Sequence, residues 1–263
     1  MVVDQEYEGK HIMAKKSPAK MRVVVVAAHP DDICCCGGLA AKYARAGHEV
    51  WQLSVTLGET VRPPGAQQQK IAVLREIEGR EICRILGVKA EFLDVPCNKI
   101  IPTMEMKMKL VNALRRLKPN ILLYPTPWDC HADHRNLSWT MRDVIYYVGH
   151  SGIAGDYPPC DLRGAGMYEI EVDTNELHQP DFVVDVSDDV QTAFRAIRCN
   201  ARAKVFGKES GRQFKHMYEV VTAFWGMRHG VAYAQPIWQT YGSMMMTHVA
   251  RATRVREDLP VWG

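Results

Sequence analysis

The sequence predicts a single α/β domain with a Rossmann-like, mostly parallel sheet flanked by helices. Short apolar runs of strand length alternate along the chain with helical segments, an order that favours right-handed crossovers between parallel strands. The 263 residues suffice for one sizeable core, and 47% hydrophobic with 24% charged residues is a globular composition. We expect this domain to span residues 21–250, between a flexible N-terminal leader at 1–20 and a C-terminal tail at 251–263.

The alternation begins with the most apolar strand of the chain. Residues 22–28 read RVVVVAA, a continuous β-branched run that is typical of a buried parallel strand. Gly37 and Gly38 lead into a helical segment, and Gly47 suits the end of that helix. The segment EVWQLSVT at 49–56 is the second predicted strand.

Two further helix–strand pairs follow. Residues 71–86 place their apolar side chains roughly on one helical face, and Gly87 ends this helix. A strand is expected at 90–95, a methionine-rich helix at 103–117 and a strand at 121–125.

The second half of the chain is less regular. Residues 146–180 are rich in Gly, Pro and Tyr without clear periodicity, which predicts a long loop region with one or two small strands. A strand is expected at 182–186, and helices are expected near 188–205 and 217–230.

Charge, hydropathy and cysteine usage restrict the partners. A formal charge of +3 is too small to indicate a nucleic-acid partner, and no apolar run approaches the ~18 residues of a membrane span. The first twenty residues lack the apolar core of a signal peptide, and the eight cysteines show no CxxC spacing. We therefore expect a cytoplasmic protein with free thiols that acts on a small molecule.

Two polar clusters follow predicted strands at their carboxyl ends. AHPDD at 28–32 follows the first strand, and TPWDCHADHRN at 126–136 follows the strand ILLYP. Ligands of parallel α/β sheets bind beyond the carboxyl ends of strands, so the topology can bring both clusters to one edge.

These clusters contain the residue types of a catalytic metal site. His29 and one carboxylate of Asp31 or Asp32 supply two ligands, and His131 or His134 supplies a third. Two imidazoles and one carboxylate suit zinc with an open position for water, and they also suit iron(II). The remaining carboxylate and imidazole then provide a base and an acid for hydrolysis of an amide or ester.

The two motifs together resemble those of the PIG-L / LmbE-like deacetylases, which are zinc enzymes that remove N-acyl groups from GlcNAc-type substrates. The resemblance covers roughly residues 21–240. It extends to GHEV at 47–50, TLGE at 56–59, LKPN at 117–120 and RHGVAYAQPI at 228–237.

The resemblance implies a role for each residue of the two motifs. Zinc is expected to be bound by three side chains: His29, Asp32 and His134. Asp31 is expected to be the general base on the metal-activated water. His131 would stabilise the oxyanion or protonate the leaving group, and Asp133 would orient His131.

Three residues are expected to bind substrate. Arg75 matches a family arginine that contacts substrate, although a solvated helix face also explains it. Trp128 suits stacking on a sugar ring or packing. Asp129 stands where some relatives carry a tyrosine, so oxyanion stabilisation by a tyrosine is expected either to be missing or to come from Tyr146, Tyr147 or elsewhere.

The segment ICCC at 33–36 departs from the family pattern next to the expected ligand Asp32. A cysteine that entered the coordination of zinc would close the position that water needs. We expect these thiols to be buried and unligated instead.

The leading prediction is a zinc-dependent deacetylase of an N-acetylated amino sugar. An amidase acting on another N-acyl compound, such as a thiol conjugate or a natural-product intermediate, is the main alternative. The second alternative is a metal-containing module that binds a ligand without catalysing a reaction. Because family relatives often form oligomers, the resemblance also implies a homo-oligomer.

Overall fold

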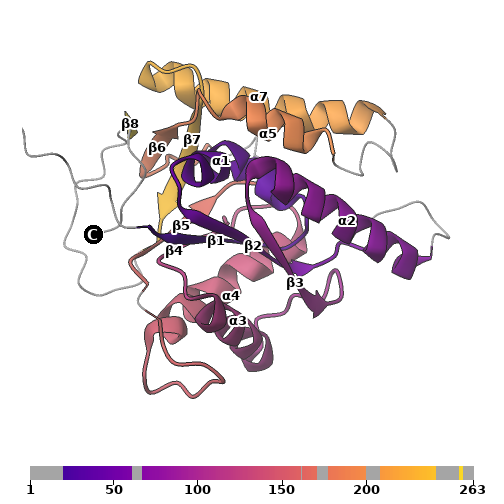
Figure 1. Ribbon diagram of the computed structural model, residues 1–263, viewed down its shortest axis with the longest axis vertical. Coiled ribbons are helices and arrows are strands. Elements are labelled where there is room, and N and C mark those ends of the chain that lie inside the picture. Colours follow the sequence, from indigo (N-terminus) through magenta and orange to yellow (C-terminus); the bar gives the residue numbers. More distant parts are fainter. Residues whose placement is uncertain are drawn as a thin grey trace, which may run out of the picture.

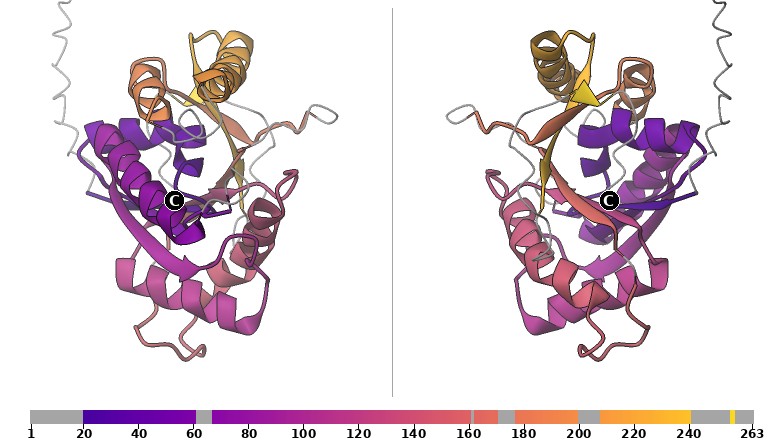
Figure 2. Two further views of the ribbon diagram at one scale, coloured as in Figure 1. Left: turned by 90° about the vertical axis from the view of Figure 1, so that its right-hand side faces the viewer. Right: turned by 90° about the vertical axis from the view of Figure 1, so that its left-hand side faces the viewer.

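The chain folds around an eight-stranded sheet with the strand order β3-β2-β1-β4-β5-β7-β6-β8. Figure 1 shows the strands in the middle of the molecule with helices on either side, and the side views of Figure 2 show the same layers. The computed structural model describes residues 20–60, 67–160, 162–170, 177–199, 208–240 and 255–256. The predicted α/β architecture is confirmed.

Five neighbouring strands form the parallel part of the sheet. These are β1 (Arg22–Ala27), β2 (Glu49–Thr56), β3 (Lys89–Val95), β4 (Ile121–Pro125) and β5 (Gly164–Tyr168). β1 lies between β2 and β4, and its residues from Val23 to Ala27 are all buried. The continuous apolar run of β1 therefore reflects a strand that is covered on both faces.

The remaining strands change direction. β7 (Ala234–Gln239) is antiparallel to both β5 and β6 (Phe182–Asp185), and β8 (Val255–Arg256) is parallel to β6. β8 falls within the predicted C-terminal tail, whereas residues 1–19 of the predicted leader and the rest of that tail lie outside the described residues. The domain boundaries stay a prediction.

Each face of the sheet has its own layer of helices and its own apolar core (Figure 2). One face is covered by α3 (Met104–Leu117) and α4 (Ala132–Gly149). The other face is covered by η1 (Asp32–Cys36), α1 (Gly37–Arg45), α2 (Gln68–Leu86), α5 (Val190–Ile197) and α7 (Lys208–His229). None of the helices in the described ranges is long and apolar enough to cross a membrane.

The irregular second half contains more regular structure than its sequence predicts. α4 continues to Gly149, so the first residues of the predicted loop region at 146–180 are helical. β5 is the small strand expected there, but it extends the parallel part of the sheet beside β4. The helix expected at 188–205 ends at Ile197, and residues 200–207 lie outside the described part of the chain.

The segment after α4 has no periodic sequence pattern, and hydrogen bonds from the Arg115 side chain fix its path. Arg115 is only 1% exposed at the end of α3. The guanidinium donates five hydrogen bonds to the backbone carbonyls of Tyr147, Val148, His150, Ile153 and Tyr157.

Replacing Arg115 with leucine is expected to lower the free energy of unfolding by about 3 kcal/mol or more, because buried carbonyls lose their donors. The neighbouring Arg116→Leu is the matched control, since the Arg116 side chain is 43% exposed and pairs with Glu91. That change should cost less than about 1 kcal/mol. Urea unfolding of both variants measures the difference, and equal losses would contradict the role of Arg115.

Candidate metal centre and active site

The turn that follows β1 holds His29 and Asp32 together. The backbone N–H of His29 donates to Asp32 Oδ2 at 2.8 Å, and Asp32 opens the helix η1. Gln52 Nε2 donates to the carbonyl of Pro30 at 3.0 Å. A Cβ at Gly79 would lie 2.7 Å from Pro30 Cβ, so glycine lets α2 pack closely against this turn. Contacts from β2 and α2 thus fix the turn.

The second cluster forms the start of α4. His131 is the N-cap of this helix, and its Nδ1 accepts the backbone N–H of Asp133 at 3.1 Å. Asp133 and His134 occupy the first turn. Since β1 and β4 are parallel neighbours, their carboxyl ends bring the two clusters to one edge of the sheet, as predicted.

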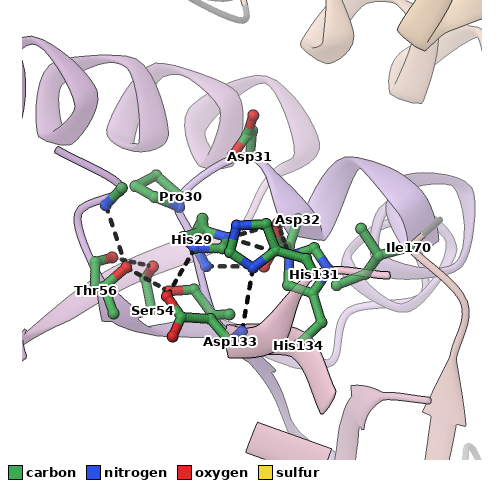
Figure 3. A network of polar contacts seen from close by, with 12 residues as sticks. His29, Pro30, Asp31, Asp32, Ser54, Thr56, His131, Asp133, His134 and Ile170 are labelled. Carbon is green, nitrogen blue, oxygen red and sulfur yellow. Dashed lines mark hydrogen bonds and ion pairs between the residues drawn. The ribbon is translucent and has the colours of Figure 1, made fainter. Parts of the chain in front are cut away.

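Three ligand atoms from the two clusters form a compact triangle, which we call the ligand triangle (Figure 3). His29 Nδ1 lies 3.0 Å from His134 Nε2 and 3.6 Å from Asp32 Oδ1, and His134 Nε2 lies 3.4 Å from Asp32 Oδ1. A tetrahedral zinc ion with bonds of about 2.0–2.1 Å places its ligand atoms about 3.3 Å apart. The spacing and the donor types therefore fit zinc.

His131 lies close enough to be considered as a ligand in place of Asp32. Ligand atoms of His29, His131 and His134 lie within 4.8 Å of one another. We favour Asp32, because its carboxylate is only 4% exposed and faces both other imidazoles. His131 is partly exposed and already uses Nδ1 to cap α4.

His131 is instead arranged as a hydrogen-bond donor. Burial and the neighbouring imidazoles of His29 and His134 lower its pKa, which favours the neutral ring. Because Nδ1 accepts a backbone N–H, the proton of the neutral ring is on Nε2. The geometry therefore leaves an Nε2–H group beside the ligand triangle.

A carboxylate holds the far side of each imidazole in the ligand triangle. His134 Nδ1 lies 2.9 Å from Asp129 Oδ2, and His29 Nε2 lies 3.3 Å from Asp133 Oδ2. Metal-binding histidines usually donate their second N–H in this way, which fixes the ring and increases its basicity. Asp129 also accepts the backbone N–H of His131 at 2.7 Å.

These contacts differ from the expected roles of both carboxylates. Asp133 was expected to orient His131, but its side chain contacts His29 and accepts the backbone N–H groups of Asn98 and Ile100. Asp129 was expected to contact substrate, but its buried carboxylate contacts His134 and the His131 backbone. The spacing of residues along the sequence does not predict that Asp133 contacts His29 or that Asp129 contacts His134.

Burial and mutual attraction together set the charges of the ligand triangle. Burial by itself raises the pKa of Asp32, but His134 and His29 hold it well below its ordinary value. Burial lowers the pKa of His134, while Asp32 and Asp129 raise it to about 9. The pKa of His29 is also raised, because Asp32 and Asp133 outweigh its burial. A metal ion entering the triangle must displace the protons of these rings.

Arg75 and Asp31 form a buried ion pair next to the triangle. Arg75 is 2% exposed, which excludes a solvated helix face, and it also pairs with Glu78 at 3.0 Å. A Cβ at Gly58 would lie 3.3 Å from Arg75 Nη2 and 3.5 Å from His29 Cδ2. A side chain at position 58 would therefore crowd both the guanidinium and the imidazole. Figure 3 shows the Asp31 side chain pointing away from the ligand triangle.

The expected aromatic groups lie outside the triangle. Trp128 stacks on His178 with ring centroids 4.1 Å apart, so one face of the indole is used in packing. Tyr146 and Tyr147 lie near the far end of α4. At a rise of 1.5 Å per residue they are about 23 Å along the helix from His131. They are therefore too distant to stabilise an oxyanion at this site.

The cysteine run does not enter the site. Cys34, Cys35 and Cys36 are buried in the core, and burial is the main cause that raises the pKa of each thiol. Cys35 Sγ donates to the carbonyl of Ile170 at 3.6 Å. Within the described residues, none of the three belongs to a group that could hold a metal ion.

Asp129→Asn is expected to weaken metal binding by about 10- to 100-fold, because His134 loses the carboxylate that fixes its ring. Competition against a chelator measures the affinity. A reduced affinity with an unchanged KM is the expected result, whereas a raised KM with unchanged affinity would support the substrate contact instead.

Comparison with known proteins places both motifs in one family domain. Residues 24–145 match the PIG-L family, described as GlcNAc-PI de-N-acetylase. The matched stretch begins in β1, ends in α4 and includes every residue of the ligand triangle.

Relatives cover most of the chain. Diacetylchitobiose deacetylase of Thermococcus kodakarensis is 26% identical over 227 residues, which is 82% of both chains. The solved N,N′-diacetylchitobiose deacetylase of Pyrococcus horikoshii is 22% identical, with a TM-score of 0.75 over 85% of both chains. GalB, the 4-carboxy-2-hydroxymuconate hydratase of Pseudomonas putida KT2440, is 19% identical, with a TM-score of 0.75 over 88% of this chain and 100% of GalB. Because proteins with different named reactions share this fold, the fold alone does not identify the reaction.

Proposed function

We propose that this protein is a zinc-dependent deacetylase of the PIG-L family that acts on an N-acetylated amino sugar. The observation that carries the proposal is the ligand triangle, whose spacing and donors suit zinc at the carboxyl edge of the sheet, within the stretch that matches the PIG-L family. The similarity to diacetylchitobiose deacetylase supports the reaction and the class of substrate.

The proposed mechanism assigns hydrolysis to groups that the structure brings together. Zinc held by His29, Asp32 and His134 would polarise the amide carbonyl and lower the pKa of water to about 7. Asp31, whose side chain pairs with Arg75 and points away from the triangle (Figure 3), would turn toward the triangle and take the proton of the attacking water.

His131 acts on the other side of the scissile bond. Its Nε2–H donates to the carbonyl oxygen as negative charge develops there, and the proton that Asp31 took from water passes to the leaving amine. Asp129 and Asp133 keep the His134 and His29 rings in place while the substrate changes charge.

Asp31→Asn is expected to lower kcat by about 10²-fold or more while the protein keeps its metal, because a positioned base contributes this much. Amine release from a panel of N-acetylated sugars measures the activity of the metal-loaded protein. Asp188→Asn is the control, since that side chain is 87% exposed.

Each outcome of this assay decides between the candidate functions. Release of amine by the wild type and its loss in Asp31→Asn would support the deacetylase. Release only from non-sugar N-acyl compounds would favour the broader amidase. Bound metal without release from any compound would contradict the proposal and favour a binding module.

A further inference from the structure

We propose that His29, Cys97 and Asp133 form a second metal site, at which excess zinc binds and inhibits the enzyme. The inference rests on the proposed function, because His29 belongs to the ligand triangle as well. Cys97 was not predicted as a site residue. It lies in the loop after β3, at the same sheet edge as the turn after β1 and the start of α4.

The three ligand atoms have the spacing of a coordination site. All lie within 4.8 Å of one another, and all three residues are buried. Asp133 Oδ2 lies 3.3 Å from His29 Nε2 and 3.7 Å from Cys97 Sγ. In a tetrahedral zinc site the N-to-O separation is about 3.3 Å, and the S-to-O separation is about 3.6 Å because the Zn–S bond is longer.

The imidazole of His29 can serve both sites because its two nitrogens face different ligands. Nδ1 lies against His134 Nε2 in the ligand triangle. Nε2 lies against Asp133 Oδ2 at the second site. One ring can thus bridge two ions once it has released its remaining N–H proton to solvent, and the ring does not need to rotate.

Polar groups surround Cys97 at the second site. Thr60 Oγ1 donates a hydrogen bond to Cys97 Sγ at 3.1 Å, a contact that also stabilises a thiolate. Glu59 Oε1 accepts the backbone N–H of Cys97 at 2.7 Å, which brings another carboxylate to the same loop. A thiolate together with imidazole and carboxylate favours zinc, cobalt or cadmium over magnesium or calcium.

Occupation of the second site would disturb the first. An ion bound to Asp133 and His29 Nε2 replaces the hydrogen bond by which Asp133 orients His29. Loss of such a contact changes the basicity of the ligand ring and the reactivity of its metal. One equivalent of zinc should therefore activate the protein, and excess zinc should inhibit it.

Cobalt(II) titration of the metal-free protein tests the site without an activity assay. The first equivalent is expected to give only ligand-field absorption from the ligand triangle. The second is expected to add the near-ultraviolet charge-transfer band of a cobalt–thiolate bond. Cys97→Ser should lose that band, whereas Cys160→Ser and Cys130→Ser should retain it.

The outcomes separate this inference from the proposed function. No thiolate band at excess cobalt, or a band that persists in Cys97→Ser, would overturn the second site. A thiolate band at the first equivalent would overturn the order of binding. His134→Ala should lose the first signal and keep the thiolate band, so a first signal that persists in this variant contradicts the ligand triangle alone.

Inhibition provides a second readout. In Cys97→Ser the zinc concentration that halves activity is expected to rise by at least about tenfold, because the site loses one of its three ligands. Cys97→Ala should behave in the same way, since neither variant offers a thiolate. Equal inhibition of the wild type and both variants would overturn the proposed cause of inhibition.

Discussion

Asp32→Asn is expected to lose its bound metal on dialysis and to lose activity with it. Asparagine keeps the size of the side chain but removes the charge that faces both imidazoles of the ligand triangle. Removing a carboxylate that only supports a ligand histidine costs about 10- to 100-fold in affinity or activity, so removal of a ligand should cost more.

Metal analysis after dialysis and amine release measure the two losses. Asp188→Asn again serves as the control, because its exposed side chain contacts the site nowhere in the described structure. Full retention of metal by Asp32→Asn would contradict the ligand triangle. It would instead favour the three imidazoles of His29, His131 and His134 as the site.

Metal affinity is expected to rise steeply with pH up to about pH 9. In the metal-free protein His134 has a pKa of about 9, and the pKa of His29 is raised as well. Below these values a metal ion must displace a proton from each ring, so each displaced proton contributes about tenfold in apparent affinity per pH unit. Above the pKa of His134 its ring is already neutral, so it no longer contributes to the pH dependence of metal affinity.

Chelator competition between pH 6 and pH 10 measures this dependence. An ordinary imidazole with a pKa of 6.5 would stop contributing above that pH, so the range from 6.5 to 9 is decisive. Titration calorimetry in two buffers that differ in ionisation enthalpy counts the released protons directly. A flat affinity over this range would show that the rings are already neutral in the metal-free protein.

The two clusters that contain the ligand triangle could be predicted because their signals are local, and the family resemblance indicated which of their residues form it. Pro30 and the two aspartates mark a polar turn directly after a continuous apolar strand. The motif HADH likewise follows an apolar strand. The order of strands and helices predicts parallel strands, and parallel strands end at the same edge of a sheet. Chemistry at this edge therefore follows from position along the chain.

The helical start of α4 could not be recognised in the same way. His131 caps the helix and Asp133 and His134 face the site, so the first turn is polar and looks like a loop. β7 was also missed, because its antiparallel place between β5 and β6 depends on contacts with strands distant in sequence.

The sequence by itself determined the α/β fold and the sheet edge that bears the chemistry, and its resemblance to the PIG-L / LmbE-like deacetylases implied the three side chains that meet in the ligand triangle. The tertiary structure decided which partner each remaining polar group contacts. It placed Asp133 on His29, Asp129 on His134 and Asp31 on Arg75, across separations that periodicity cannot encode. The reason is physical: a buried charge must be paired wherever the fold brings a partner within reach, and only the packed chain defines that neighbour.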